Sequence, residues 1–430
     1  MITPLTYVVR FGFCATLASF VALCTGPVQA QGKAPVIVLS ATKHAYHNTP
    51  VTIKLPGNSA AKIAMLGGYL MLTPASAKTG KPIRAQATIE DKSTRLSFIM
   101  DDLPMGESRS YRLGQVVFVR RPDKQVEVAQ KGDDLEISFD KTLFTRYTTH
   151  SGPNKPFFYP ILTPSGEHIS RRWPVEPTAN PNESHDHPHH RGLWFAHSRV
   201  NGIDFWSEQD PKVGKSVTVG YENVRSGWVF GGFVAKTEWR TPEDKLIAMD
   251  RRDVKIYELP NGDRVMDFSI TVTPVGGPLT FGDNKDGLFG LRVPDSLAIT
   301  ADRSSKIKPE GHIETASGAN GKDAWGKPNA WVDYWGPIGG RTYGVAIFDA
   351  PTNIRHPETW HARDYALFTV NPFGLHDFGR GPRDAGDYTV AEDKTITFTY
   401  RLLFHKGDTT TAGIADQYAG FADPPDVQVK

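Results

Sequence analysis

The density of glycine and proline along the chain is the feature that most constrains its fold. The 430 residues include 40 Gly and 32 Pro, and both residue types interrupt helices. A protein of many short strands joined by turns tolerates this composition, whereas a mostly helical protein does not. We therefore expect an all-β protein, and its length allows two domains, or one large sheet domain with a smaller one.

The spacing of apolar residues supports this expectation. Apolar and polar side chains alternate along residues 266–272 and 396–402, which is typical of strands that bury one face. Residues 139–404 admit a dozen or more such strands without helix-length connections, so we expect stacked antiparallel sheets.

A single helix is predicted, near the end of the chain. Asp408 is its expected cap, and the run begins at Thr409, with Ile414, Tyr418 and Phe421 spaced by four and three residues. This spacing places the three apolar side chains on one helix face, and we expect that face to pack on a sheet.

Residues 1–30 have the pattern of a signal peptide. Arg10 precedes an uncharged apolar run at 11–23, and small residues stand at Val28 and Ala30, as at a cleavage site. The run is shorter than the ~20 residues needed to span a membrane. We expect cleavage after Ala30 and a periplasmic or extracellular protein without stable membrane insertion; a retained anchor helix is the alternative.

Both cysteines, Cys14 and Cys24, lie in this segment. The mature chain would then contain no thiol, which excludes a disulfide scaffold and a cysteine nucleophile.

Beyond the leader we expect two domains. Residues 31–114 contain short alternating runs and no tryptophan, and they are typical of a small immunoglobulin-like β-domain. Residues 115–425 form the predicted large β-sandwich with its C-terminal helix. All nine tryptophans lie between Trp173 and Trp360, so this part holds either the larger core or a cleft lined by rings that stack on sugars.

Electrostatics exclude one class of partner. Lys and Arg total 49 against 47 Asp and Glu, for a net charge of +2. A balanced charge argues against a polybasic nucleic-acid surface.

The strongest chemical signal is a cluster of histidines. Five of the 14 histidines fall within residues 185–197. Imidazole transfers protons near neutral pH, and a neighbouring carboxylate such as Asp186 fixes its tautomer. We interpret the segment as a loop for proton transfer and substrate binding.

Two other interpretations of the cluster remain open. Imidazole also binds zinc, copper or iron, and His-x-His on a strand places both rings on one face. A cupin-type site needs a carboxylate soon after the second histidine, and the four residues after His187 offer none. Histidines that serve only the structure are the third interpretation. We predict no cofactor, with a divalent metal as the alternative.

Further motifs are consistent with a polar pocket. Lys285 and Asp286 precede Gly287, as a positioned acid/base pair or as a solvated ion pair. The alternation in residues 360–365 would present His361 and Arg363 on one face of a strand. The alternative for that segment is an exposed strand without a site.

Three more segments offer polar or aromatic groups. Arg292 is a charge between apolar neighbours, Asn371 binds a hydroxyl or caps a turn, and Trp331 with Asp333 offers a stacking platform beside a carboxylate.

The chain resembles the PmoA-like family, exported or bacterial proteins of mostly unknown function. The matching motifs occur in the family's order at residues 158–160, 172–174, 186–195, 201–206, 281–292, 360–365 and 371–374. Related sequences often have Glu where this chain has Asp286. The family's inherited label, methane oxygenation, requires transmembrane helices and copper chemistry, and the sequence contains neither signal.

The resemblance implies a large antiparallel β-sandwich of the galactose-mutarotase type, a scaffold frequent among carbohydrate-active proteins. We therefore expect an exported protein that cleaves a glycoside or rearranges a sugar by histidine-centred acid/base catalysis. A non-catalytic glycan-binding protein and a His-ligated metal-dependent oxygenase or lyase are the alternatives.

The expected ligand is an oligosaccharide or a sugar-derived small molecule. The predicted catalytic residues are His187, His190, Lys285, Asp286 and His361. The predicted substrate-binding residues are His189, Arg191, Trp194, His197, Asn201, Arg292, Trp331, Asp333, Arg363 and Asn371.

Overall fold

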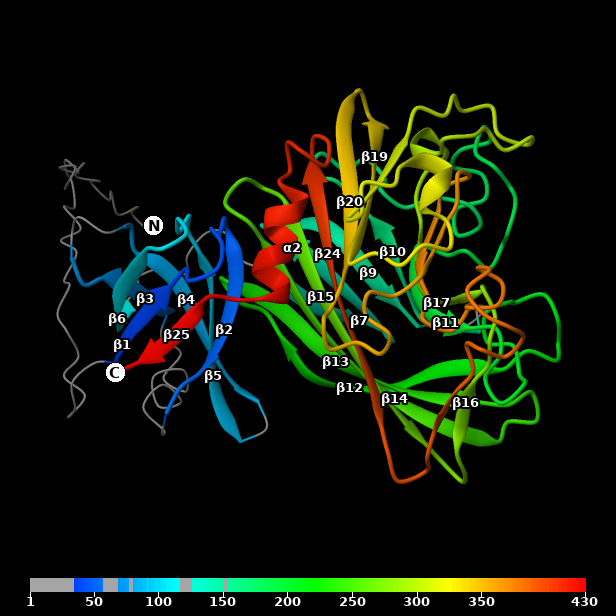
Figure 1. Ribbon diagram of the computed structural model, residues 1–430, viewed down its shortest axis with the longest axis horizontal. Helices are drawn as coiled ribbons and strands as arrows, with labels where there is room; N and C mark the ends of the chain where they lie inside the picture. Colours follow the sequence, from blue (N-terminus) through cyan, green and yellow to red (C-terminus); the bar gives the residue numbers. More distant parts are fainter. Residues whose placement is uncertain (1–34, 57–68, 77–79, 91, 117–125, 150–153) are drawn as a thin grey trace, which may run out of the picture.

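The structure is a computed structural model that describes residues 35–56, 69–76, 80–90, 92–116, 126–149 and 154–430. The predicted leader, residues 1–30, lies outside the described residues. Strands dominate the described chain, and the predicted all-β fold class is confirmed: a large antiparallel β-sandwich follows a small β-domain (Figure 1).

The small domain is one seven-stranded antiparallel sheet around its own apolar core. In spatial order its strands are β2 (Thr49–Lys54), β5 (Ser93–Met100), β4 (Ile83–Glu90), β3 (Tyr69–Pro74), β6 (Ser108–Val116), β1 (Val36–Ser40) and β25 (Asp426–Val429). The last strand comes from the end of the chain and pairs with β1. The small domain is thus completed by residues far from it in sequence.

The sandwich contains two eight-stranded sheets. The front sheet has the order β21 (Trp360–Ala362), β22 (Leu367–Val370), β17 (Gly287–Arg292), β11 (Leu193–His197), β10 (Phe157–Ile161), β9 (Thr142–Thr148), β8 (Asp134–Phe139) and β7 (Val126–Lys131). The rear sheet has the order β12 (Lys215–Arg225), β13 (Phe230–Arg240), β14 (Leu246–Glu258), β15 (Arg264–Pro274), β24 (Ile396–Lys406), β20 (Arg341–Asp349), β19 (Trp331–Ile338) and β18 (His312–Thr315).

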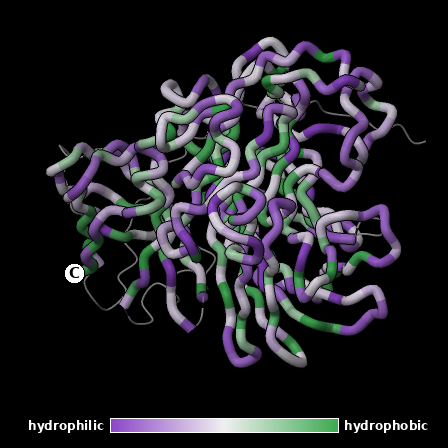
Figure 2. The backbone as a smooth tube through the Cα atoms, turned by 45° about the vertical axis from the view of Figure 1, so that its right-hand side comes forward, coloured by the Kyte–Doolittle hydropathy of each residue, from purple (hydrophilic) through white to green (hydrophobic). Residues whose placement is uncertain are grey.

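The main core lies between these two sheets. Phe289 of the front sheet stacks on Tyr400 of the rear sheet, with ring centroids 5.0 Å apart, and also contacts Phe268 at 4.8 Å. In Figure 2, apolar stretches alternate with polar ones along the backbone. The alternation in the sequence therefore buries one face of each sheet against the other.

Short elements complete the sandwich. β16 (Leu279–Phe281) pairs with β23 (Tyr388–Val390), and two short 3₁₀ helices occur at η1 (Asp295–Leu297) and η2 (Gly321–Ala324). In the part of the chain that the structure describes, no helix has the length and apolar character needed to cross a membrane.

The C-terminal helix starts later than its pattern suggests. α2 (Ile414–Ala422) begins after Gly413, whose φ of 62° lies in the left-handed region and prevents the helix from extending backward. The Asp408 carboxylate accepts a bond from the Thr411 amide at 2.7 Å and caps only the preceding turn. The helix packs on the sandwich through Tyr418, whose ring meets Phe348 at 5.7 Å.

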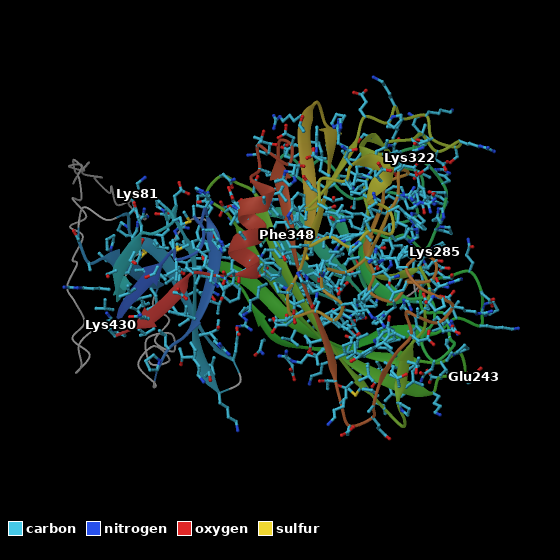
Figure 3. All side chains as sticks on the ribbon, viewed as in Figure 1. Lys81, Glu243, Lys285, Lys322, Phe348 and Lys430 are labelled. Carbon is cyan, nitrogen blue, oxygen red and sulfur yellow. The ribbon has the colours of Figure 1, made fainter. Side chains whose placement is uncertain are left out.

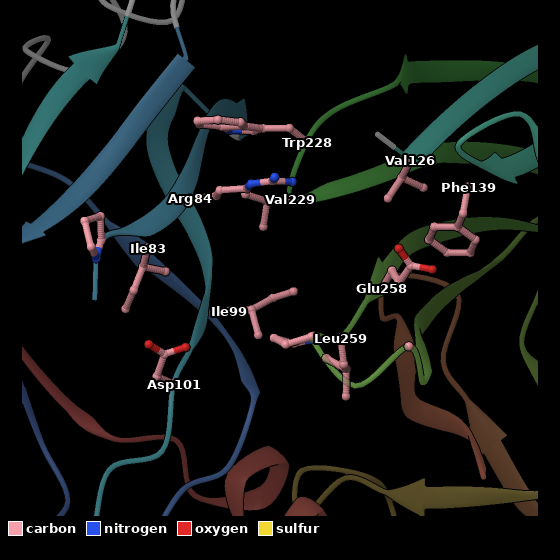
Figure 4. Close-up of a pocket in the computed structure, with 13 residues that line it drawn as sticks. Ile83, Arg84, Ile99, Asp101, Val126, Phe139, Trp228, Val229, Glu258 and Leu259 are labelled. Atoms are coloured by element: carbon pink, nitrogen blue, oxygen red, sulfur yellow. The ribbon is translucent and has the colours of Figure 1, made fainter. Parts of the chain in front are cut away.

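The two domains are joined by specific contacts. The Trp228 indole donates to the Ala85 carbonyl at 2.8 Å, and the Glu90 carboxylate accepts from Arg225 and Lys255 at 3.2 and 3.0 Å. A cavity of roughly 430 Å³ remains between the domains, lined largely by apolar side chains such as Ile99 (Figure 4).

Candidate functional site

The site is built on the outer face of the front sheet. Partners in an antiparallel ladder share a face, so the pairings Trp194–Gly290, Gly290–Thr369 and Thr369–His361 place one row of residues across four strands. Gly290 has no side chain, and a Cβ there would lie 2.7 Å from the Thr369 methyl group. Because Gly290 has no side chain, the side chains of Trp194 and Thr369 both pack against its backbone in the middle of the row.

A column of aromatic rings rises from this row. It contains Tyr365, His187, His190 and Trp194 in that order, and successive centroids lie 5.4, 4.7 and 5.2 Å apart with nearly parallel planes. The histidine loop, residues 183–192, supplies the two middle rings. The His187 side chain is 41% exposed, whereas His190 is only 2% exposed. His187 is therefore the imidazole that meets solvent.

Asp186 anchors the column. Its carboxylate contacts the buried guanidinium groups of Arg171 and Arg292, with Arg292 at 2.9 Å, and accepts a bond from His187 Nδ1. Burial raises the pKa of Asp186, but the bond from His187 and the charges of both arginines outweigh burial and lower it overall. Asp186 is thus held as an anion, and Nδ1 of His187 carries the proton, which leaves Nε2 as the basic atom.

The loop is also tied to the sheet from below. The Arg292 amide donates to the Gly192 carbonyl and the Arg171 amide to the Arg292 carbonyl, each at 2.9 Å. Ser184 donates through its amide and its hydroxyl to the buried carboxylate of Asp295, at 2.6 and 2.9 Å. These bonds fix the backbone from which His187 projects.

His361 and the Lys285–Asp286 pair form the other side of the site. His361 Nδ1 donates to the Lys285 carbonyl at 3.1 Å and lies 3.8 Å from the Asp286 carboxylate. Lys285 Nζ is 3.4 Å from the same carboxylate, and both charged side chains are about one third exposed or more. Burial, together with the charges of Arg363 and Lys285, lowers the pKa of His361 to about 3. His361 is therefore neutral at pH 7, and its buried Nε2 has no partner among the described residues.

A second polar group extends the site beyond the histidine loop. The Glu208 carboxylate accepts from Lys155 and Arg191, both at 2.7 Å, and the Lys155 ammonium is fully buried. Burial and the charge of Lys155 together lower the pKa of His189 to about 4. His189 is thus a neutral ring beside a paired cation.

Tyr365 joins the two sides. Its ring stacks on His187, and the guanidinium carbons of Arg292 and Arg363 lie 4.9 and 5.1 Å from the ring centroid. The structure thus brings all five predicted catalytic residues into one region, together with His189, Arg191, Trp194, Arg292 and Arg363.

Asn371 supports this region from beneath. Its amide donates to the carbonyls of Asn284 and Lys285 at 2.9 Å, and it is fully buried. It holds the turn that presents Lys285 and Asp286.

Four predicted substrate-binding residues lie elsewhere. His197 is buried against Phe373 and Phe281 and donates to the Gly282 carbonyl. Asn201 lies in a turn, where its side-chain oxygen accepts from the Thr280 amide at 2.7 Å and its own amide donates to the Thr280 carbonyl at 2.9 Å. Their surroundings are those of packing and turn residues.

The other two residues of this group belong to the rear sheet. Asp333 is buried and bonds His405 and Thr409, and Trp331 packs in a cluster with Phe348. The alternation along β19 placed both on the outer face of the rear sheet rather than beside the histidine loop.

The sequence pattern missed several residues of the site. Arg171 and Tyr365 lie within or beside the motifs at 172–174 and 360–365 but carry no signal of their own. Lys155 and Glu208 are brought to His189 only by the fold. Within the described ranges, no group of three or more His, Cys, Asp and Glu side chains is arranged to hold a metal ion.

Comparison with known proteins adds a family and two distant folds. No curated protein matches the chain significantly. A solved protein in the glycosyl hydrolase family 38 from Enterococcus faecalis has 11% identity and a TM-score of 0.40, covering 93% of this chain and 48% of that one. An alpha-mannosidase from Enterococcus faecalis V583 has 10% identity and a TM-score of 0.38, covering 94% and 46%. The chain spans about half the length of both.

The match to a family is more extensive. Residues 134–419 match a family described as "Family of unknown function (DUF6807)". The expected membership of the PmoA-like family is wrong, because nothing in the comparisons points to that family. The matched residues include the rear sheet, every strand of the front sheet except β7, and the whole histidine loop. The chain therefore belongs to the family of unknown function DUF6807.

Proposed function

We propose that the protein is an exported enzyme that converts a carbohydrate by acid/base catalysis at the histidine loop. The observation that carries this proposal is the Asp186–His187 pair. An anionic carboxylate accepts a bond from Nδ1 of a partly exposed imidazole, which leaves Nε2 as the base. Two buried arginines hold the carboxylate in place.

The partner in proton transfer is the Lys285–Asp286 pair. Both groups are partly exposed, and His361 ties their backbone turn to the same sheet face. An acid and a base that approach a substrate from two sides suit glycoside cleavage or sugar rearrangement, because each reaction takes a proton from one atom and gives one to another.

The chemistry of the surface supports a sugar as the substrate. Planar rings alternate with charged and neutral hydrogen-bonding groups around His187, Tyr365 and Arg363. A sugar has an apolar ring face and several hydroxyl groups, so it matches such a mixture. Export rests on the leader-like pattern of residues 1–30.

The test begins with a search for a substrate. The mature protein is incubated with plant and microbial oligosaccharides, with and without EDTA, and products are identified by mass spectrometry. On a confirmed substrate, His187→Ala should lower kcat by roughly 10²–10⁴, the range for loss of an acid/base group. The melting temperature should change little, because the ring is partly exposed and Asp186 keeps both arginines as partners.

Two control variants separate chemistry from packing. His190→Ala removes a buried ring and should lower the melting temperature. His312→Ala makes the same chemical change on the rear sheet, where the ring stacks on Trp335, and should leave kcat unchanged. Full activity of His187→Ala contradicts the proposal. If the wild-type protein binds a glycan without turnover and His187→Ala binds it with the same affinity, the protein is a glycan-binding protein. Loss of activity in EDTA indicates a metal-dependent enzyme.

A further inference from the structure

Among the described residues, Arg363 is an arginine of the site without an ion-pair partner. Arg171 and Arg292 both contact Asp186, and Arg191 contacts Glu208. Among the described residues, no carboxylate lies within ion-pair distance of Arg363. The neighbouring carboxylate in the chain, Asp364, pairs with Lys322 at 3.2 Å instead.

The position of Arg363 makes its charge available at the site. Its guanidinium lies over the Tyr365 ring at 5.1 Å, and Tyr365 stacks on His187. The side chain is partly exposed rather than buried. A guanidinium that rests on an aromatic face is oriented at little entropic cost.

The imidazoles near Arg363 do not compete with it for an anion. Burial lowers the pKa of His361 to about 3, and the charges of Arg363 and Lys285 contribute to the decrease. Burial and the charge of Arg292 also lower the pKa of His190, to well below its ordinary value. Both rings are therefore neutral at pH 7.

The floor of the site also contains polar atoms without partners in the described part of the chain. They include the Thr369 hydroxyl, Nε2 of His361 and Nη1 of Arg292, and all three are buried. These residues lie on the same sheet face as Trp194. A buried polar group without a partner is destabilising, and these three groups make the interior beneath the site polar.

We infer that Arg363 binds an oxyanion substituent, so that the substrate is an acidic sugar: a uronate, or a sugar that carries a sulfate ester. This inference rests on the proposed function and names its substrate class. The guanidinium fork matches two oxygens of a carboxylate or sulfate with parallel bonds. A neutral sugar offers no such partner and leaves the charge of Arg363 unmatched.

The experiment compares each acidic sugar with the hexose of the same configuration. Isothermal titration calorimetry on the full mature chain measures glucuronate against glucose, galacturonate against galactose, mannuronate against mannose, and the 6-sulfates of the three hexoses. At least one acidic sugar should bind about tenfold or more tightly than its hexose, as expected for a charge-assisted bond. Preference for the carboxylate or for the sulfate then identifies the oxyanion.

Variants assign this preference to Arg363. Arg363→Gln should reduce the acidic-to-neutral affinity ratio about tenfold or more, and Arg363→Lys should restore part of it because the charge returns without the fork. The ratio within one variant does not depend on the fraction of folded protein. Arg251→Gln removes an exposed arginine from the rear sheet and should leave the ratio unchanged.

The outcomes separate this inference from the proposed function. Acidic sugars that bind no better than their hexoses, or a preference that survives in Arg363→Gln, overturn the inference. If a neutral sugar is converted and His187→Ala abolishes its turnover, the acid/base function stands and the acidic substrate falls. If Arg363→Gln loses a uronate preference while His187→Ala retains full turnover, the acidic substrate stands and the catalytic assignment falls.

Discussion

Asp186 is the residue that holds the candidate site together. Its carboxylate contacts two guanidinium groups that are fully buried and also orients His187. A buried charge without its partner is strongly destabilising. We therefore expect Asp186→Asn to lower the free energy of unfolding by about 3–5 kcal/mol at pH 7, as measured by urea titration. Asp393→Asn, at an exposed carboxylate, should change it by less than about 0.5 kcal/mol.

The same variant has a defined pH dependence. The pKa of Asp186 is lower in the folded protein than its ordinary value of about 3.9 in an unfolded chain. Its contribution to stability is therefore complete above about pH 4 and is lost as the pH falls toward the folded-state pKa. The difference between wild type and Asp186→Asn should stay constant from about pH 7 to 5 and shrink in stronger acid. A difference that grows on acidification contradicts this assignment.

At the scale of elements, the four-strand row depends on close contact between β11, β17 and β22. A Cβ at Gly290 would meet the Thr369 methyl group at 2.7 Å and the Trp194 ring at 3.2 Å. We expect Gly290→Ala to destabilise the protein by about 1–3 kcal/mol, as overpacking does, and to reduce turnover because the base of the ring column moves. Thermal unfolding and kcat measure the two effects.

The rear sheet offers a matched control for this substitution. A Cβ at Gly220, in β12, would meet no heavy atom within 4 Å, and the backbone there does not have a left-handed φ. Gly220→Ala should be neutral or slightly stabilising, since alanine restricts the unfolded chain. Equal changes of stability in the two variants would contradict overpacking at Gly290.

At the scale of the whole molecule, the chain leaves the small domain and returns to it. β25 pairs with β1, and Val427 and Val429 pack against the small core. A chain that ends at Pro425 loses this strand and exposes the edge of β1. We expect the small domain to unfold at a lower temperature, as seen by calorimetry and by faster amide exchange in β1.

The candidate site should be insensitive to this truncation. Figure 3 places Lys285 at the end of the sandwich remote from the small domain and from Lys430. Turnover at a temperature below both transitions should therefore match that of the full chain. Loss of turnover without loss of the sandwich's transition would indicate coupling between the domains.

Local patterns in the sequence were sufficient for the fold class and for the centre of the site. Alternation with period two predicts strands because it depends on neighbouring residues only, and the helix was predicted with its correct apolar face but began too early at Thr409. The histidine cluster was visible because its residues are adjacent in the chain. The roles assigned to them remain predictions.

The sequence alone determines which segments are strands and which of their faces are apolar. It also determines where imidazoles are concentrated. Three features follow only from the folded arrangement. They are the contacts of Asp186 with Arg171 and Arg292, the place of Tyr365 in the ring column, and the position of Asp333 in a different sheet. The difference arises because strand neighbours and register are set by packing of the two sheets and by pairings across many residues. Alternation specifies that a side chain points outward, but sheet packing specifies what it meets there.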